Sequence, residues 1–144
     1  MTVAAILKHK GNDVTTVRPT ADVAEVARLL TERRIGSAVV QDTEGQLLGI
    51  VNERDIVAAL AEHGPAALRL TVDHLMTRAL TTATKHTSVA EAMAMMTAGR
   101  FRHIPVLEDG QLIGIISIGD VVKARIMAQE GEVESLRAYV AGAA

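Results

Sequence analysis

The sequence contains two copies of one segment, and this internal repeat limits what the chain can fold into more than any other feature. The first seven identities pair residues 66 positions apart, starting from Thr15, Thr16, Val23, Ala24, Glu25, Arg34 and Val40. After one deletion, seven more pair residues 65 positions apart, starting from Gly45, Gln46, Leu47, Gly49, Ile50, Asp55 and Val57. Fourteen identities in the same order are hard to obtain by chance, so the repeat predicts two copies of one small unit.

Each copy predicts the same order of elements: a strand, a helix, two strands and a second helix. The strands are expected at 14–17, 38–40 and 47–51, and at 80–83, 104–107 and 112–116. The first helix of each copy has the i, i+3, i+4, i+7 spacing of a helix with one buried face, at Val23, Val26, Ala27 and Leu30 and at Val89, Ala92, Met93 and Met96. Asp109 and Gly110 suit a tight hairpin because both tolerate positive φ.

These elements divide the chain into five predicted segments. Residues 14–63 and 79–128 form the two units, and residues 64–78 link them, with one helical turn expected at 72–76. Residues 1–13 are predicted to be an N-terminal helical segment. Residues 129–144 are predicted to be a C-terminal helical tail, which Gly131 is expected to interrupt or bend.

Composition and charge argue against two classes of partner. The 15 basic and 17 acidic residues are spread along the chain and give a formal net charge of -2, which offers no basic face for a nucleic acid. No uncharged stretch approaches the roughly 18 residues needed to span a bilayer, and the chain has no cysteine. We therefore expect a cytoplasmic protein that binds neither nucleic acid nor membrane.

Catalytic and metal sites are not expected either. No pair of histidines has helical i, i+4 spacing and no cysteine accompanies them, which argues against a metal site. The sequence also shows no recognisable set of acid, base and nucleophile, so an enzyme is the least supported class. The histidines are His9, His63, His74, His86 and His103.

A motif at the end of the last strand of each copy points to ligand binding. The motif runs from Gly49 to Asp55 and from Gly114 to Asp120, with a small polar residue three positions before the aspartate. A strand that runs into a helix N-terminus leaves free N–H groups for a phosphate, and the aspartate can accept both hydroxyls of a ribose. The same spacing fits a capping box, in which the acid accepts a hydrogen bond from the cap N–H and binds no ligand.

The doubled motif resembles tandem CBS domains, named after cystathionine β-synthase, as does the segment Arg100-Phe101-Arg102-His103-Ile104-Pro105-Val106. The resemblance covers about residues 5–128. It implies an α+β fold in which two β-α-β-β-α units pack about a pseudo-twofold axis into a Bateman module. It also implies ligands such as AMP, ADP, ATP, NAD or S-adenosylmethionine in the clefts between the repeats.

The resemblance further implies roles for individual residues. Asp120 and Asp55 correspond to the family's ribose-binding aspartate and Ser117 to its hydroxyl residue, whereas Asn52 stands where Ser or Thr is usual. Arg102 and Arg54 are candidate phosphate ligands, since a guanidinium binds two phosphate oxygens at once; the alternative is that both are solvated surface charges. Backbone groups that hold adenine correspond to Thr82, Ala83, His103, Ile104 and Pro105, and to Thr16, Val17, Ser37 and Ala38.

From this resemblance we expect a regulatory, non-enzymatic sensor of an adenosine nucleotide (AMP, ADP, ATP or NAD). Since no effector domain is recognised in the sequence, its output is expected to pass to a separate, unidentified protein or to a second copy. The alternative is a module without a ligand that dimerises or docks a partner. Modules of the family tend to pair through the second helix of each repeat, so we expect a homodimer that uses Ile56, Leu60, Val121 and Val122.

Overall fold

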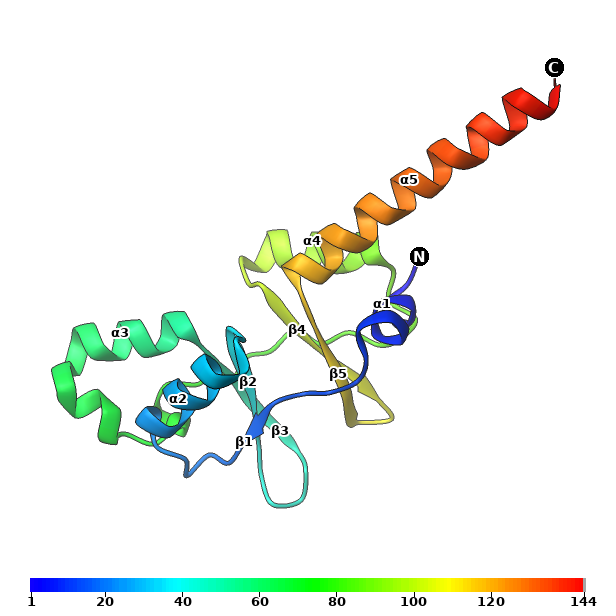
Figure 1. Ribbon diagram of the computed structural model, residues 1–144. Helices are drawn as coiled ribbons and strands as arrows, with labels where there is room; N and C mark the ends of the chain where they lie inside the picture. Colours follow the sequence, from blue (N-terminus) through cyan, green and yellow to red (C-terminus); the bar gives the residue numbers. More distant parts are fainter. Residues whose placement is uncertain (144) are drawn as a thin grey trace.

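The structure is a computed structural model that describes residues 1–143. It has two lobes, one for each repeat, and the C-terminal helix projects away from the second lobe (Figure 1). The predicted α+β fold of two similar units is confirmed. The first repeat contains β1 (Thr16–Val17), α2 (Val23–Arg33), β2 (Ser37–Gln41), β3 (Leu47–Asn52) and α3 (Glu53–His63), and the second contains α4 (Val89–Gly99), β4 (His103–Glu108), β5 (Gln111–Ser117) and α5 (Ile118–Ala143).

Each repeat holds a small sheet. In the first, β1 is parallel to β2 and β2 is antiparallel to β3. In the second, β4 and β5 form the predicted hairpin, in which Asp109 and Gly110 have φ values of 51° and 78°. The predicted helix stripes are also confirmed, because Val23, Val26 and Leu30 lie in the first core and Val89, Ala92 and Met96 in the second.

The strand predicted at 80–83 is wrong. Only Ala83 pairs with the sheet, through a single parallel bridge to Val106. The chain turns on both sides of this residue, because Leu80 N–H donates a hydrogen bond to a carbonyl two residues earlier and Thr84 N–H donates to Thr87 Oγ1. The second sheet therefore has two strands and one bridge where the first has three strands.

Two helical segments each pack on the repeat that they do not directly precede, and we call them the exchanged segments. Helix α1 (Val3–Lys10) comes before the first repeat but packs on the second, where its Val3, Ile6 and Leu7 enter the core. The linker forms two 3₁₀ helices, η1 (Gly64–Arg69) and η2 (Val72–His74), and the second of them enters the core of the first repeat through Val72. Each segment therefore completes the core of the repeat that it does not lead into.

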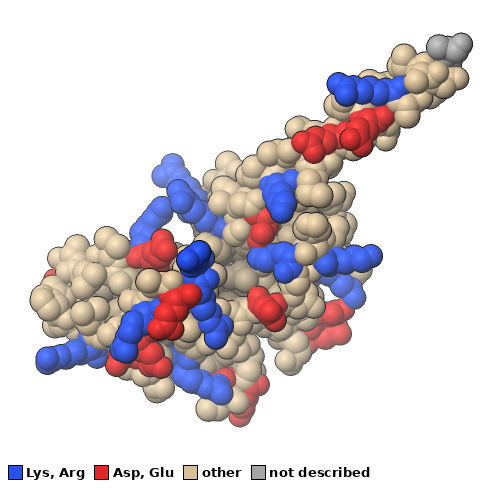
Figure 2. Space-filling model, viewed as in Figure 1, with Lys and Arg blue, Asp and Glu red and all other residues tan. Residues whose placement is uncertain are grey.

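Helix α5 continues without interruption for 26 residues, so the expected break at Gly131 is wrong. A single glycine in a helix costs only about 1 kcal/mol relative to alanine, which is too little to end it. The projecting part carries both acidic and basic side chains (Figure 2). Within the described part of the chain, neither α5 nor any other helix combines the length and the apolar character needed to cross a membrane.

Two of the four positions expected in a dimer interface lie inside the protein. Ile56 is 8% exposed and Val121 is fully buried, because both face the core of their own repeat. Leu60 and Val122 are 38% and 44% exposed, so only these two remain available for contacts with a second copy.

Candidate functional site

The motif of the first repeat forms a capping box at the start of α3. Asp55 N–H donates a 2.9 Å hydrogen bond to Asn52 Oδ1, and Asn52 N–H donates a 2.9 Å hydrogen bond to Asp55 Oδ2. Glu53 N–H donates to the carbonyl of Gly36. Two of the first three N–H groups of α3, those of Glu53 and Asp55, therefore already donate hydrogen bonds within the protein.

The motif of the second repeat has the same geometry at the start of α5. Asp120 N–H donates to Ser117 Oγ at 3.1 Å, and Ser117 N–H donates to Asp120 Oδ2 at 2.8 Å. Ile118 N–H donates to the carbonyl of Arg102. Within residues 1–143, these bonds occupy two of the three N–H groups of the first turn in each repeat and leave those of Arg54 and Gly119 as donors for the expected phosphate.

One oxygen of each carboxylate stays available for a ligand. Both Asp55 and Asp120 use Oδ2 for the capping bond, and among residues 1–143 Oδ1 of neither accepts a hydrogen bond. Ser117 Oγ accepts a bond from the backbone, so its own O–H can still donate to a ligand oxygen. A capping box and a ribose site are therefore compatible at this position.

Lys10 distinguishes the two motifs, and no motif in the sequence points to it. Its Nζ donates hydrogen bonds to Asp120 Oδ2 at 2.7 Å and to the carbonyl of Ile115 at 2.9 Å. It reaches the second repeat because α1 packs there. The residue 66 positions later is Met76, so Asp55 has no equivalent cation.

The pKa values of the two aspartates shift in opposite directions. Burial raises the pKa of Asp55 above its ordinary value, and the Asn52 N–H and the Arg54 charge only partly offset this. Burial also acts to raise the pKa of Asp120, but the Lys10 ammonium and the Ser117 N–H outweigh it and hold that pKa below its ordinary value. The second site is therefore the more firmly anionic of the two.

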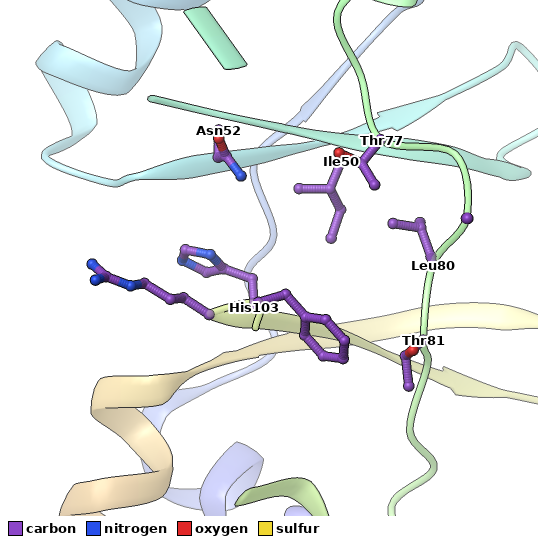
Figure 3. Close-up of a pocket in the computed structure, with 9 residues that line it drawn as sticks. Ile50, Asn52, Thr77, Leu80, Thr81 and His103 are labelled. Atoms are coloured by element: carbon purple, nitrogen blue, oxygen red, sulfur yellow. The ribbon is translucent and has the colours of Figure 1, made fainter. Parts of the chain in front are cut away.

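A small cavity of about 70 Å³ lies between the repeats. The Asn52 side chain at the end of β3 points toward the His103 ring at the start of β4, with Ile50, Thr77 and Leu80 along the wall (Figure 3). Burial, reinforced by the charges of Lys10 and Arg102, lowers the pKa of His103, so its ring is neutral at pH 7. The cavity thus offers a neutral imidazole and an amide, both of which donate and accept hydrogen bonds.

Several of the residues whose backbone groups are expected to hold adenine are buried in or beside the sheets. Ala83 N–H donates to the carbonyl of Pro105, so these two backbone groups already bind each other. Ala38 and Ile104 are 1% and 0% exposed, and Ser37 is also buried. Thr82 lies on the surface.

The remaining predicted residues line separate hollows. Arg102, His103 and Asn52 share the cavity between the repeats. Asp120 lines a groove of about 170 Å³ between α1 and α5, next to Lys10. Thr16 and Val17 line a hollow beside the β2–β3 loop, Asp55 lines another between α3 and η2, and Arg54 is exposed.

Acid should weaken the contact between Lys10 and Asp120. Because the folded pKa of Asp120 lies below the value of about 3.9 for an unfolded carboxyl, the pair stabilises the protein above pH 4 and loses this effect as the pH falls through the folded pKa. We expect Lys10→Met to lower the free energy of unfolding by about 0.5–1 kcal/mol at pH 7 and by less at pH 2, where the Asp120 charge is reduced and the bond to the Ile115 carbonyl remains. Urea unfolding at both pH values measures this. Lys8→Met, at an exposed site on the same helix, is the control, and an equal loss at both pH values would contradict the assignment.

Comparison with known proteins places the fold in a family. A family model of the CBS domain matches residues 3–62 and 72–126. A CBS domain-containing protein of Arabidopsis thaliana, the mitochondrial CBSX3, is 36% identical over 149 residues, covering 98% of this chain and 72% of that protein. The crystal structure of the CBS-domain protein ATU1752 from Agrobacterium tumefaciens is similar with a TM-score of 0.85 and 46% identity, over 87% of this chain and 99% of that one.

Two further similar structures contain adenosine compounds. CBSX2 in complex with AMP has a TM-score of 0.73 and 27% identity, over 89% of this chain and 98% of that one. The CBS domain pair of MJ0100, in complex with 5′-methylthioadenosine and S-adenosyl-L-methionine, has a TM-score of 0.77 and 25% identity, over 90% of this chain and 98% of that one. The expected resemblance is confirmed: the chain belongs to the CBS-domain family and carries two CBS repeats.

Proposed function

We propose that this protein is a regulatory module that binds an adenosine nucleotide beside Asp120. Membership of the CBS-domain family supports a regulatory role, and the complexes of CBSX2 and MJ0100 show that similar CBS pairs bind adenosine compounds. The observation that carries the proposal is the Asp120 carboxylate, which is held in place by the Ser117 N–H and Lys10 through Oδ2 while Oδ1 stays available. A fixed carboxylate of this kind suits the two hydroxyls of a ribose.

AMP is the ligand to test first, because the similar CBS pair of CBSX2 has been crystallised with AMP. The local charges do not select among AMP, ADP, ATP and NAD, because the cations Lys10 and Arg102 and the carboxylates of Asp120 and Glu53 all act on His103. Arg102 and the Ser117 hydroxyl are the donors expected to meet a phosphate.

Binding should widen the space between the repeats. The cavity of about 70 Å³ is well below the roughly 300 Å³ at the lower end of small-molecule sites, so a nucleotide that enters from the Asp120 side has to separate the repeats to reach His103. A ligand shifts a conformational equilibrium only through its different affinities for the two states. A nucleotide that contacts both repeats would therefore couple its binding to the angle between them, and this angle would be the signal passed to a separate protein.

Asp120→Asn tests the proposal. The amide still accepts the capping bond but loses the charge, so we expect the affinity for AMP to fall about tenfold to a hundredfold, the effect of losing one or two charged hydrogen bonds. Isothermal titration calorimetry of the wild type and the variant measures this. Asp55→Asn changes the corresponding capping box and is the matched control, expected within about threefold of the wild type. Equal losses in both variants, or no binding by the wild type, would refute the assignment to Asp120.

A module without a ligand is the second candidate. It is favoured by the same contacts, because the backbone and Lys10 already satisfy Oδ2 of Asp120. It predicts no heat with AMP, ATP, NAD or S-adenosylmethionine. It also predicts that the purified protein shows no absorbance maximum near 260 nm, which is easy to see because the chain has no Trp.

A further inference from the structure

We propose that α5 pairs with α5 of a second copy of this chain as a parallel, two-stranded coiled coil. Apolar side chains recur along one side of the helix with alternating spacings of four and three residues, which is the a and d pattern of a coiled-coil seam. One polar residue, Gln129, interrupts it. The seam consists of Val122, Ile126, Gln129, Val133, Leu136 and Val140, with Ile126, Val133 and Val140 at a positions.

The seam faces away from the protein's own core. Val121 and Ala124, at c and f positions, are 0% and 7% exposed because they pack on the second repeat. Ile126 and Leu136, in the seam, are 50% and 64% exposed. A partner helix can therefore lie along the whole seam, because the second repeat packs against the opposite side of α5.

The projecting helix lacks support within its own chain. Every residue from 129 to 142 is exposed, so no packing from the body stabilises this part. Gly131 and the β-branched Val133 and Val140 are weak helix formers, and a free helix of this length is marginal in water. A second helix along the seam, about 27 Å from Val122 to Val140, supplies the missing packing.

The charges beside the seam identify the partner as a parallel copy. In a parallel pair each g residue lies near the e residue of the next heptad of the partner. Arg125 at g then meets Glu130 at e, and Glu132 at g meets Arg137 at e, so both pairs have opposite charges. The a positions all hold β-branched residues and one d position holds leucine, a combination that favours a parallel dimer of helices.

Two single-cysteine variants test the pairing and its direction. The natural chain has no cysteine, so Ile126→Cys and Val140→Cys introduce the only thiols. Both variants are expected to form disulfide-linked dimers under mild oxidation, because an in-register parallel pair places every seam residue beside its own copy. An antiparallel pair can bring only one position next to itself. Cross-linking of one variant alone, or of neither, would overturn the proposal.

A charge in the seam gives an independent test on the full chain. Leu136→Asp is expected to weaken dimerisation about a hundredfold, whereas Ala138→Asp, at the outward f position of the same turn, should change it less than about threefold. Light scattering over a concentration series measures the fraction with twice the chain mass of 15.3 kDa. A wild type that stays monomeric, or equal effects of the two variants, would count against the coiled coil.

Discussion

Truncation of Ile116 to alanine is expected to lower the free energy of unfolding by about 2–5 kcal/mol, the range for removing a large aliphatic side chain from a core. Ile116 is fully buried, pairs with Ile104 across the β4–β5 hairpin and belongs to the core that also holds Leu7 of α1. It directly precedes Ser117, the residue that caps α5. The same substitution should therefore loosen the box that holds Asp120 and weaken AMP binding along with stability.

Urea unfolding of Ile116→Ala at pH 7 measures the loss of stability. Val57→Ala is a suitable control because Val57 is 64% exposed on α3, and surface substitutions usually change stability by no more than about 0.5 kcal/mol. A typical domain is stable by only about 5–15 kcal/mol, so the expected loss is a large share of the total. A change below about 1 kcal/mol would show that the second core does not depend on this side chain.

The repeated units could be predicted from the sequence because their signals are local. The apolar stripes of α2 and α4 follow from residue spacing alone, and the hairpin follows from two adjacent residues that tolerate positive φ. The capping alternative also came from spacing, and the hydrogen bonds of Asn52 with Asp55 show that it forms. What these features share is that each depends on residues within about ten positions of one another.

The contact of Lys10 with Asp120 could not be predicted in this way. The two residues are 110 positions apart, and Lys10 reaches the site only because α1 packs on the second repeat rather than on the first. Helix α1 also contributes Val3, Ile6 and Leu7 to the core that contains Val121. Neighbouring Val121 and Val122 look alike in the sequence, yet one is buried in the core and the other lies on the surface.

The strand expected at 80–83 and the break expected at Gly131 failed for different reasons. Residues suited to a strand form one only where a neighbouring strand lies in register with them, and the turns on both sides of Ala83 prevent this. At Gly131 the sequence signal was overestimated, because one glycine costs a helix only about 1 kcal/mol relative to alanine. Context outweighed local preference at residues 80–83, whereas at Gly131 the local penalty itself was small.

The glycine of each motif, Gly49 or Gly114, leaves room for the exchanged segment that packs over that sheet. An added Cβ on Gly49 would lie 2.7 Å from the carbonyl oxygen of Thr77, a backbone atom of the linker. Two hydrogen bonds fix the linker at this point, from Ile50 N–H to Thr77 O at 3.1 Å and from Thr77 N–H to Ile50 O at 2.8 Å. An added Cβ on Gly114 would instead lie 2.6 Å from the end of the Leu7 side chain, which can rotate away.

Gly49→Ala is therefore expected to cost about 2–4 kcal/mol of stability, since the backbone of the linker has to move and its paired hydrogen bonds weaken. Gly114→Ala is the matched control and should cost about 1 kcal/mol, because one flexible side chain absorbs the added methyl group. Thr77 and Ile50 also line the cavity between the repeats, so Gly49→Ala should reduce AMP binding even where the protein is fully folded. Urea unfolding of both variants, followed by calorimetry with AMP below the unfolding transition, measures the two effects. If Gly114→Ala proves as costly as Gly49→Ala, the distinction between a fixed backbone and a movable side chain does not hold at these positions.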